Sequence, residues 1–252
     1  MHSICIQSTI HQLLTILYIY DIRYVNPYAH LEDWHTVIKY IHNTSNELDC
    51  SINPDRVSVW GSSFAGGHVL KLASDEPSLE CCIAQVPFVG GLESITQMPL
   101  STIIQSTTYA LYDTIFSGIL GIIKPYRVAN IAPNNKFAIL SSPDSYPSFL
   151  HMSPTNDLSV YKYNATTPAR TILHVLTYRP LWNAHHIIPK TLIMAGKNDL
   201  LIPYWAVERG AKRIYGVEFD GTTIDGHFDP YEKKFNETVE KQTDFLRRNL
   251  NL

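Results

Sequence analysis

The chain has 252 residues, of which 45% are hydrophobic and 17% are charged, and its formal net charge at pH 7 is −3. This length suits one large domain or two small ones with a sizeable buried core. Lysine and arginine are scattered along the chain, so the sequence lacks the basic cluster that nucleic-acid-binding proteins present. We therefore expect a globular protein without a nucleic-acid partner.

The four cysteines are Cys5, Cys50, Cys81 and Cys82, and none has the spacing of a metal site. The adjacent pair Cys81 and Cys82 lies in an apolar run, which indicates a buried strand. Free buried thiols are typical of proteins in a reducing compartment. We therefore expect no metal and a cytoplasmic location.

Residues 3–20 contain no Asp, Glu, Lys or Arg. A signal peptide would carry a basic start and a cleavage site of small residues, and neither is clear here. A membrane span needs about 20 strongly apolar residues, and polar residues such as Gln7 and His11 interrupt this stretch. We expect a buried strand over roughly residues 14–22 and no stable membrane span.

Strand patterns alternate with helix patterns along most of the chain. The expected elements are a strand at residues 14–22, a helix at 29–45, a strand at 55–60, a helix at 64–73, strands at 81–89, 190–196 and 212–219, and an amphipathic helix at 233–250. This alternation predicts an α/β fold with a mostly parallel sheet and helices on both faces.

Residues 90–186 interrupt this alternation of strand and helix patterns. They contain a helical pattern at 108–123 and turn-rich pieces around Pro143, Pro147 and Pro154. The stretch is too long for a simple crossover between two strands. We expect residues 1–252 to form one domain in which residues 90–186 form a helical cap or lid.

The stretch VSVWGSSFAGGHV, at residues 57–69, runs from a strand pattern into a helix pattern through small residues. That context is typical of a nucleophile elbow, in which a serine stands on a sharp turn between two small residues. Centring the motif on Ser63 places Gly61 and Ala65 at the small positions, whereas centring it on Ser62 would place bulky Trp60 there. Ser63 is therefore the candidate nucleophile, and the Phe64 N–H is a candidate oxyanion donor. The alternative is a plain helix start capped by a serine.

A serine nucleophile needs a histidine base that a carboxylate orients. Asp199 follows a buried strand, and His227 follows the last expected strand, so the chain order is Ser, Asp, His. Asp199 could instead form a local turn, and His227 could be a packed loop residue. Asp225 and Asp229 are rival carboxylates, and His68 is expected to pack rather than to react.

Three segments, RVSVWGSSFAGGHVL, IPKTLIMAGKNDLLIP and DGHFDPYEKKF, together resemble the α/β-hydrolase superfamily. The nearest resemblance is to serine-aminopeptidase-like and Xaa-Pro-dipeptidyl-peptidase-like members, which are related to dienelactone hydrolases. It implies hydrolysis of an ester, thioester, amide or lactone without a cofactor. It also implies that Ser63 is the nucleophile, Asp199 the acid, His227 the base and Phe64 an oxyanion donor.

The resemblance is incomplete at the start of the chain. The segment YIYDIRYVNPYAHLEDW lacks the glycine-rich loop expected before its helix, and no His-Gly precedes it. The first strands and the second oxyanion donor are therefore expected to be missing, which would expose a sheet edge and could favour a homo-oligomer. Two functions remain open, namely a serine hydrolase acting on a small acyl substrate, and a catalytically impaired binding or interaction protein.

Overall fold

The computed structural model describes residues 25–44, 53, 56–133, 136–153 and 166–250. Its main sheet has the order β1-β2-β6-β7, formed by β1 (Val59–Ser62), β2 (Cys81–Gln85), β6 (Lys190–Met194) and β7 (Glu218–Asp220). Every pairing in it is parallel. The predicted parallel sheet is confirmed, whereas the strand expected at residues 14–22 lies outside the described residues.

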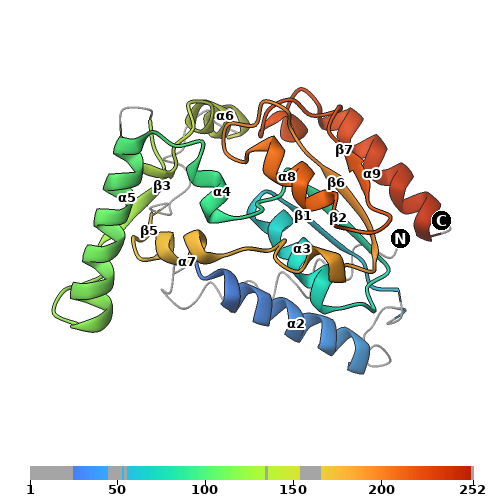
Figure 1. Ribbon diagram of the computed structural model, residues 1–252, viewed down its shortest axis with the longest axis horizontal. Helices are drawn as coiled ribbons and strands as arrows, with labels where there is room; N and C mark the ends of the chain where they lie inside the picture. Colours follow the sequence, from blue (N-terminus) through green and yellow to red (C-terminus); the bar gives the residue numbers. More distant parts are fainter. Residues whose placement is uncertain (1–24, 45–52, 54–55, 134–135, 154–165, 251–252) are drawn as a thin grey trace.

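Helices cover both faces of this sheet (Figure 1). Cys82 and Ala84 join the core beneath α2 (Pro27–Thr44), α3 (Phe64–Asp75) and α8 (Tyr204–Ala211). The alternate residues Cys81 and Ile83 join a second core, where Phe245 of α9 (Phe235–Leu250) packs. Because successive side chains of a strand point to opposite faces, a strand buried on both faces is apolar along most of its length.

Four expected strands differ from the observed ones at their ends, and one of them, β6, stops at Met194 rather than at residue 196. β1 begins at Val59 rather than near residue 55, and β2 ends at Gln85 because Val86 turns to a positive φ of 38°. The strand expected at residues 212–219 is mostly wrong, since only Glu218–Asp220 pairs. Lys212 instead ends α8, and Gly216 adopts a φ of 68°, a turn conformation.

The insertion, which we define as residues 90–186, lies between β2 and β6. Its elements are α4 (Gly91–Ile95), α5 (Leu100–Tyr112), the π-helix η1 (Asp113–Ile119), β3 (Arg127–Ile131), β4 (Ala138–Leu140), α6 (Ser145–Met152), β5 (Thr166–Pro168), α7 (Thr171–Thr177) and the 3₁₀ helix η3 (Ala184–His186). The three strands form a separate sheet of order β4-β3-β5, which the sequence analysis did not predict. The insertion is therefore mixed rather than purely helical.

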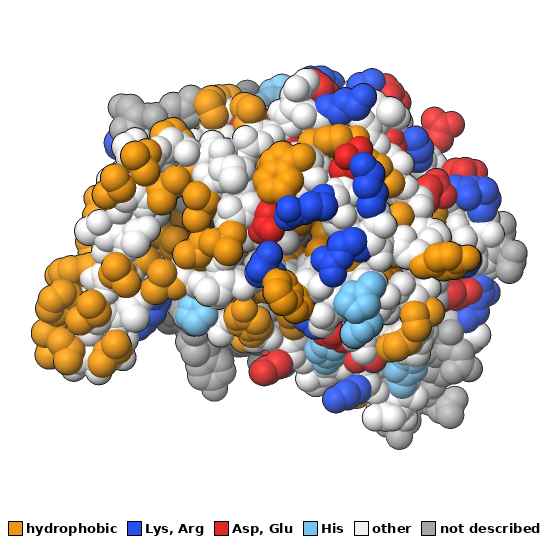
Figure 2. All heavy atoms as spheres, viewed as in Figure 1, with side chains coloured by type: hydrophobic (Ala, Val, Ile, Leu, Met, Phe, Trp, Pro, Cys, Tyr) orange, Lys and Arg blue, Asp and Glu red, His pale blue; other side chains and the backbone are white. Residues whose placement is uncertain are grey.

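Helix α5 and η1 form the part of the insertion farthest from the main sheet, at the left of Figure 1. Exposed apolar side chains gather there in Figure 2, among them Leu100, Ile104, Leu111, Ile115 and Ile119. Beneath them Asp113 is fully buried and accepts hydrogen bonds from the N–H groups of Tyr126 (2.7 Å) and Arg170 (3.0 Å). That carboxylate ties η1 to the small sheet. None of the described helices is long and apolar enough to cross a membrane.

Candidate functional site

Ser63 lies between β1 and α3, at a turn with φ 55° and ψ −119°. A positive φ is uncommon for a residue with a side chain, and such strain persists only where neighbours enforce it. The Ser63 N–H donates to the Gln85 carbonyl at 2.9 Å, and the Ser63 carbonyl accepts from the Phe88 N–H at 2.9 Å. Gly61 is required here, because an added Cβ would collide with the Ala65 carbonyl. The turn is thus fixed to the end of β2.

Val86 is the second described non-glycine residue with a positive φ, and it stands at the end of β2 beside this turn. Its side chain is buried, and its N–H donates to the Met194 carbonyl at 2.8 Å. A β-branched residue adopts this conformation at a cost, so its packing must hold it there. Backbone strain is therefore concentrated where β1, β2 and β6 end.

Ser63, His227 and Asp199 are brought together in one hydrogen-bonded row. The Ser63 Oγ lies 2.9 Å from His227 Nε2, and His227 Nδ1 lies 2.7 Å from Asp199 Oδ2. His227 and Asp199 are both buried. Because the carboxylate can only accept, Nδ1 of a neutral His227 carries the proton and Nε2 is free to accept one from Ser63.

The second oxygen of Asp199 fixes the orientation of the carboxylate. Asp199 Oδ1 accepts from the N–H groups of Leu201 and Ile202, each at 2.8 Å. Asp199 follows β6 and His227 follows β7, so both come from the carboxyl ends of parallel strands. That edge is where α/β sheets bind ligands.

The two rival carboxylates serve the loop around His227 rather than its ring. Asp229 Oδ2 accepts from the N–H groups of Asp225 (3.1 Å) and Gly226 (2.9 Å). Asp225 accepts from the Asn198 side-chain amide at 2.8 Å. The structure therefore places Asp199, and neither rival, against His227 Nδ1.

Ser62 belongs to a separate polar network, which the sequence analysis missed. Its Oγ hydrogen-bonds to Tyr231 Oη and accepts from Gln85 Nε2 at 2.9 Å. Gln85 Oε1 in turn accepts from Gln242 Nε2 at 2.7 Å, and Gln242 Oε1 accepts from Trp60 Nε1 at 2.9 Å. A glutamine inside the apolar run CCIAQV was the available signal.

His68 packs in the core, as its position on the helix predicted. Its Nδ1 lies 2.8 Å from Tyr178 Oη, and its Nε2 lies 3.4 Å from His30 Nδ1 on α2. Burial, with a smaller contribution from the neighbouring His30, lowers the pKa of His68 to about 4. His68 is therefore neutral at pH 7, and its two ring nitrogens hydrogen-bond to Tyr178 and His30 rather than to Ser63.

Phe64 is the first residue of α3, so its N–H has no partner within the helix. Its ring packs on Phe88 and Tyr178 at centroid distances of 5.3 and 5.8 Å. The packing fixes the residue while its backbone N–H stays at the positive end of the helix dipole, beside Ser63.

A cavity of about 870 Å³, which we call the Ser63 cavity, adjoins the serine. Val25, Phe64, Phe88, Leu201 and Ile202 line it from the body of the fold. The insertion supplies most of the remaining wall, through residues of α4, α5, the small sheet, α6 and α7. No charged side chain is present among the described lining residues, so the cavity suits a neutral apolar group.

In the described part of the chain, no group of three or more His, Cys, Asp and Glu side chains is placed to hold a metal ion. Cys81 and Cys82 are free and buried, as expected, and burial raises the pKa of both thiols. Cys5 and Cys50 lie outside the described residues.

Solved structures similar to this chain are α/β hydrolases at low sequence identity. The α/β hydrolase GrgF of Penicillium sp. sh18 has a TM-score of 0.66 and 16% identity, over 90% of this chain and 74% of its own. DcsB, solved with a substrate analogue, has a TM-score of 0.67 and 14% identity, over 89% of this chain and 73% of its own. These similarities show the fold.

Among curated proteins, the quorum-quenching protein AidA of Acinetobacter baumannii (strain MDR-ZJ06) is 34% identical over 221 residues, which cover 87% of this chain and 69% of AidA. An uncharacterized 31.7 kDa protein of Escherichia coli, from the traX-finO intergenic region, is 24% identical over 82% of this chain and 70% of its own. No family model matches the chain. Its identity to AidA shows that the chain belongs to the AidA family, and its structure shows that the fold is that of the α/β hydrolases.

Proposed function

We propose that this protein hydrolyses a carboxylic ester of an apolar acyl group, with Ser63 as nucleophile, His227 as general base and acid, and Asp199 as the residue that orients His227. The observation that carries the proposal is the row of two hydrogen bonds from Ser63 through His227 to Asp199, at 2.9 and 2.7 Å. It ends at a strained turn that opens onto an apolar cavity.

The proposed reaction has two halves. Ser63 Oγ attacks the acyl carbonyl carbon while His227 Nε2 takes the hydroxyl proton, and His227 then gives that proton to the departing alkoxide oxygen. The acyl group is now an ester of Ser63. Water attacks this ester, His227 takes a proton from the water, and the proton returns to Ser63 Oγ as the carboxylic acid leaves.

The developing oxyanion needs hydrogen-bond donors. The Phe64 N–H, at the start of α3, is the proposed first donor. In α/β hydrolases the second donor comes from a loop that leads into an early helix. Here Val25, just before α2, lines the Ser63 cavity together with Phe64. We propose that the Val25 backbone supplies the second donor, in place of the one expected to be missing.

The cavity indicates the class of substrate. Its volume of about 870 Å³ is large, its described lining carries no charge, and the insertion forms most of its wall. We propose that residues 90–186 act as a cap that selects a long apolar acyl chain. Because the relative AidA is named a quorum-quenching protein, a small signalling molecule with a hydrolysable acyl bond is the proposed natural substrate.

A second candidate is a binding protein that keeps the fold but does not turn over. The feature that would favour it is an incomplete oxyanion hole, since losing one donor typically costs about 10²–10³ in turnover. Such a protein would bind apolar esters in the Ser63 cavity and release them unchanged.

Labelling with a fluorophosphonate distinguishes a hydrolase from a binding protein that does not turn over. We expect stoichiometric labelling of the wild type, no labelling of Ser63→Ala, and retained labelling of Ser62→Ala and of Ser106→Ala, whose serine lines the same cavity. Hydrolysis of p-nitrophenyl esters of increasing chain length would then follow. A folded wild type that neither labels nor hydrolyses any of these esters would contradict the hydrolase proposal.

A further inference from the structure

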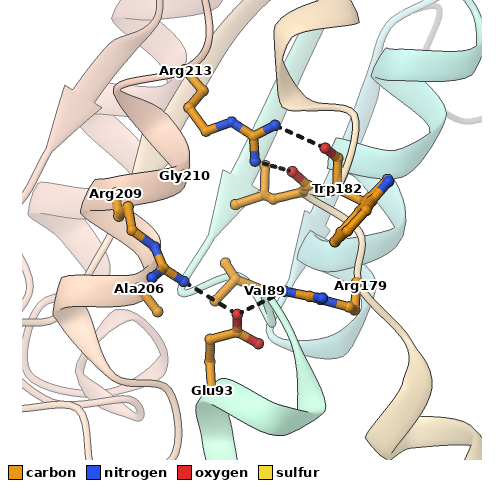
Figure 3. A pocket seen from close by; sticks show the side chains of 9 residues that line it. Val89, Glu93, Arg179, Trp182, Ala206, Arg209, Gly210 and Arg213 are labelled. Atoms are coloured by element: carbon orange, nitrogen blue, oxygen red, sulfur yellow. Dashed lines mark hydrogen bonds and ion pairs between the residues drawn. The ribbon is translucent and has the colours of Figure 1, made fainter.

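A second pocket, of about 380 Å³, lies outside the Ser63 cavity and shares no lining residue with it (Figure 3). We call it the arginine pocket, because Arg179, Arg209 and Arg213 line it. It is bounded by α4, α8 and the turn that follows α7. Figure 2 shows basic side chains gathered near the middle of this face, beside α8.

Glu93 on α4 is the one acidic residue among those that line the pocket. Arg179 and Arg209 reach it from opposite sides and donate to the same oxygen, Oε1, at 3.4 and 3.2 Å (Figure 3). The other oxygen, Oε2, is buried and has no hydrogen-bond partner among the described residues. Each guanidinium has five N–H donors, so most of them remain available.

Arg213 is held by backbone carbonyls rather than by a carboxylate. Its Nη1 and Nη2 donate to the carbonyls of Leu181 and Trp182, at 3.1 and 2.9 Å. Carbonyls carry no net charge, so this guanidinium is oriented without being neutralised. The residues that line the pocket therefore carry three permanent positive charges and one carboxylate, which is an excess of about two positive charges.

The rest of the pocket is apolar and aromatic. Val89, Leu181 and Ala206 line it beside the arginines. Arg179 stacks on the ring of Trp182, with its guanidinium carbon 4.6 Å from the ring centroid. Stacking and a fixed fork geometry are the features by which arginine recognises carboxylates and phosphates.

We propose that the arginine pocket binds a small organic anion, in which a phosphate or carboxylate group meets the three guanidinium groups and an apolar body lies against Val89 and Leu181. The unbalanced positive charge and the open volume of about 380 Å³ support a ligand site here in addition to a link between α4 and α8. Binding of an anion at this site requires no reaction at Ser63, and its test requires no turnover.

Isothermal titration of the wild type with phenyl phosphate at low ionic strength and about pH 8, up to about 10 mM, tests the proposal. Inorganic phosphate and phenylacetate are titrated in parallel. Comparison with inorganic phosphate gives the contribution of the ring, and comparison with phenylacetate shows whether phosphate or carboxylate binds better. Benzyl alcohol is the neutral control. We expect saturable binding of phenyl phosphate, weakening as salt is added, and no binding of benzyl alcohol.

Two variants should change the affinity in opposite directions. Arg209→Gln removes one donor, and we expect at least about tenfold weaker binding of phenyl phosphate. Glu93→Gln removes the competing carboxylate, and we expect several-fold tighter binding. The control Lys212→Gln removes an equal charge near the end of α8 from a side chain that lies outside the pocket, and it should stay within about twofold of wild type.

Absence of saturable binding to the folded wild type would overturn the proposal. So would an Arg209→Gln variant that binds within twofold of wild type. If Glu93→Gln does not fold, Arg209→Gln and Lys212→Gln decide the question, because both side chains are largely exposed and their loss should leave the fold intact.

Discussion

Asp199 divides its two carboxylate oxygens between the backbone and His227. Oδ1 accepts two N–H groups, and Oδ2 faces His227 Nδ1. An asparagine must keep its carbonyl oxygen toward the two N–H donors, so its NH₂ group would face His227 and force the proton onto Nε2. Asp199→Asn should therefore lower kcat about 10⁴-fold, the loss seen for this change in the serine-protease triad.

Asp225→Asn is the matched control, because Asp225 lies in the same loop as His227 and accepts from Asn198 instead. We expect its kcat to stay close to wild type. Steady-state hydrolysis of a p-nitrophenyl ester measures both variants. Equal losses of kcat in Asp199→Asn and Asp225→Asn would contradict the role assigned to Asp199.

Gln85 is the centre of the buried network beneath Ser63. It donates to Ser62 and accepts from Gln242. Gln85→Leu removes the acceptor of the buried Gln242 amide and one of the donors to Ser62, and a buried polar group that loses its partner costs about 1–3 kcal/mol. We expect the free energy of unfolding in urea to fall by at least that amount. Gln105→Leu, at an exposed position on α5, should change it by less than about 0.5 kcal/mol.

The sequence was sufficient to identify the three residues of the hydrogen-bonded row. Ser63 stands between small residues at a strand-to-helix change, and Asp199 and His227 follow expected strands, so topology alone brings them to one edge. Gln85 stands out in an apolar run, but its partners Ser62 and Tyr231 could not be predicted, because hydrogen bonds between distant side chains leave no periodic pattern. The three catalytic roles remain predictions, as does the assignment of Phe64.

At the scale of elements, α2 and α3 meet through two histidines. Burial holds the pKa of His68 at about 4, below its ordinary value of 6.5. Between these pH values the unfolded chain binds a proton that the folded chain does not, so stability is complete above pH 6.5 and falls as pH decreases toward 4. At about 1.4 kcal/mol per pKa unit, this loss is on the order of 2 kcal/mol by pH 5.

Urea unfolding at pH 7.5 and pH 5 measures this dependence. His68→Asn should be less stable than wild type at pH 7.5 but should lose less stability between the two pH values. His151→Asn, at an exposed position on α6, should keep the wild-type dependence. An unchanged dependence in His68→Asn would mean that another group is responsible.

The elements that periodicity predicted well are those with long patterns. α2, α3 and α9 and the central strands β2 and β6 were all expected near their observed positions. The strands of the insertion were missed because β4 and β5 have only three residues each, too few for an alternation to be visible. β7 was misplaced because it also has only three paired residues, and the apolar turn next to them resembles a continuation of the strand.

At the scale of the whole molecule, the body supplies the reactive row and the insertion supplies most of the cavity wall. Ile139 on β4 lines the Ser63 cavity from the insertion. Ile139→Trp should therefore fill part of the cavity without touching Ser63. We expect kcat/KM for decanoyl esters to fall at least about tenfold while that for acetyl esters changes less than about threefold.

Ile119→Trp, at an exposed position of η1, is the control and should leave the chain-length preference unchanged. Parallel losses for long and short esters in Ile139→Trp would argue against the insertion as the determinant of acyl length. The expected homo-oligomer also stays a prediction at this scale, and sedimentation of the wild type at several concentrations tests it.

Helix α4 faces both pockets at once. Glu93 contacts the arginines on one side, and Ser94 and Ile95 line the Ser63 cavity on the other. Just beyond the helix, Gln97 donates to the Asp199 carbonyl at 3.2 Å. An anion that drew Arg179 and Arg209 away from Glu93 would loosen a wall of the acyl cavity. If the anion thereby changes the affinity for an acyl ligand by some factor, linkage requires that the acyl ligand change the affinity for the anion by the same factor. One short helix would then couple ligand binding in the two pockets.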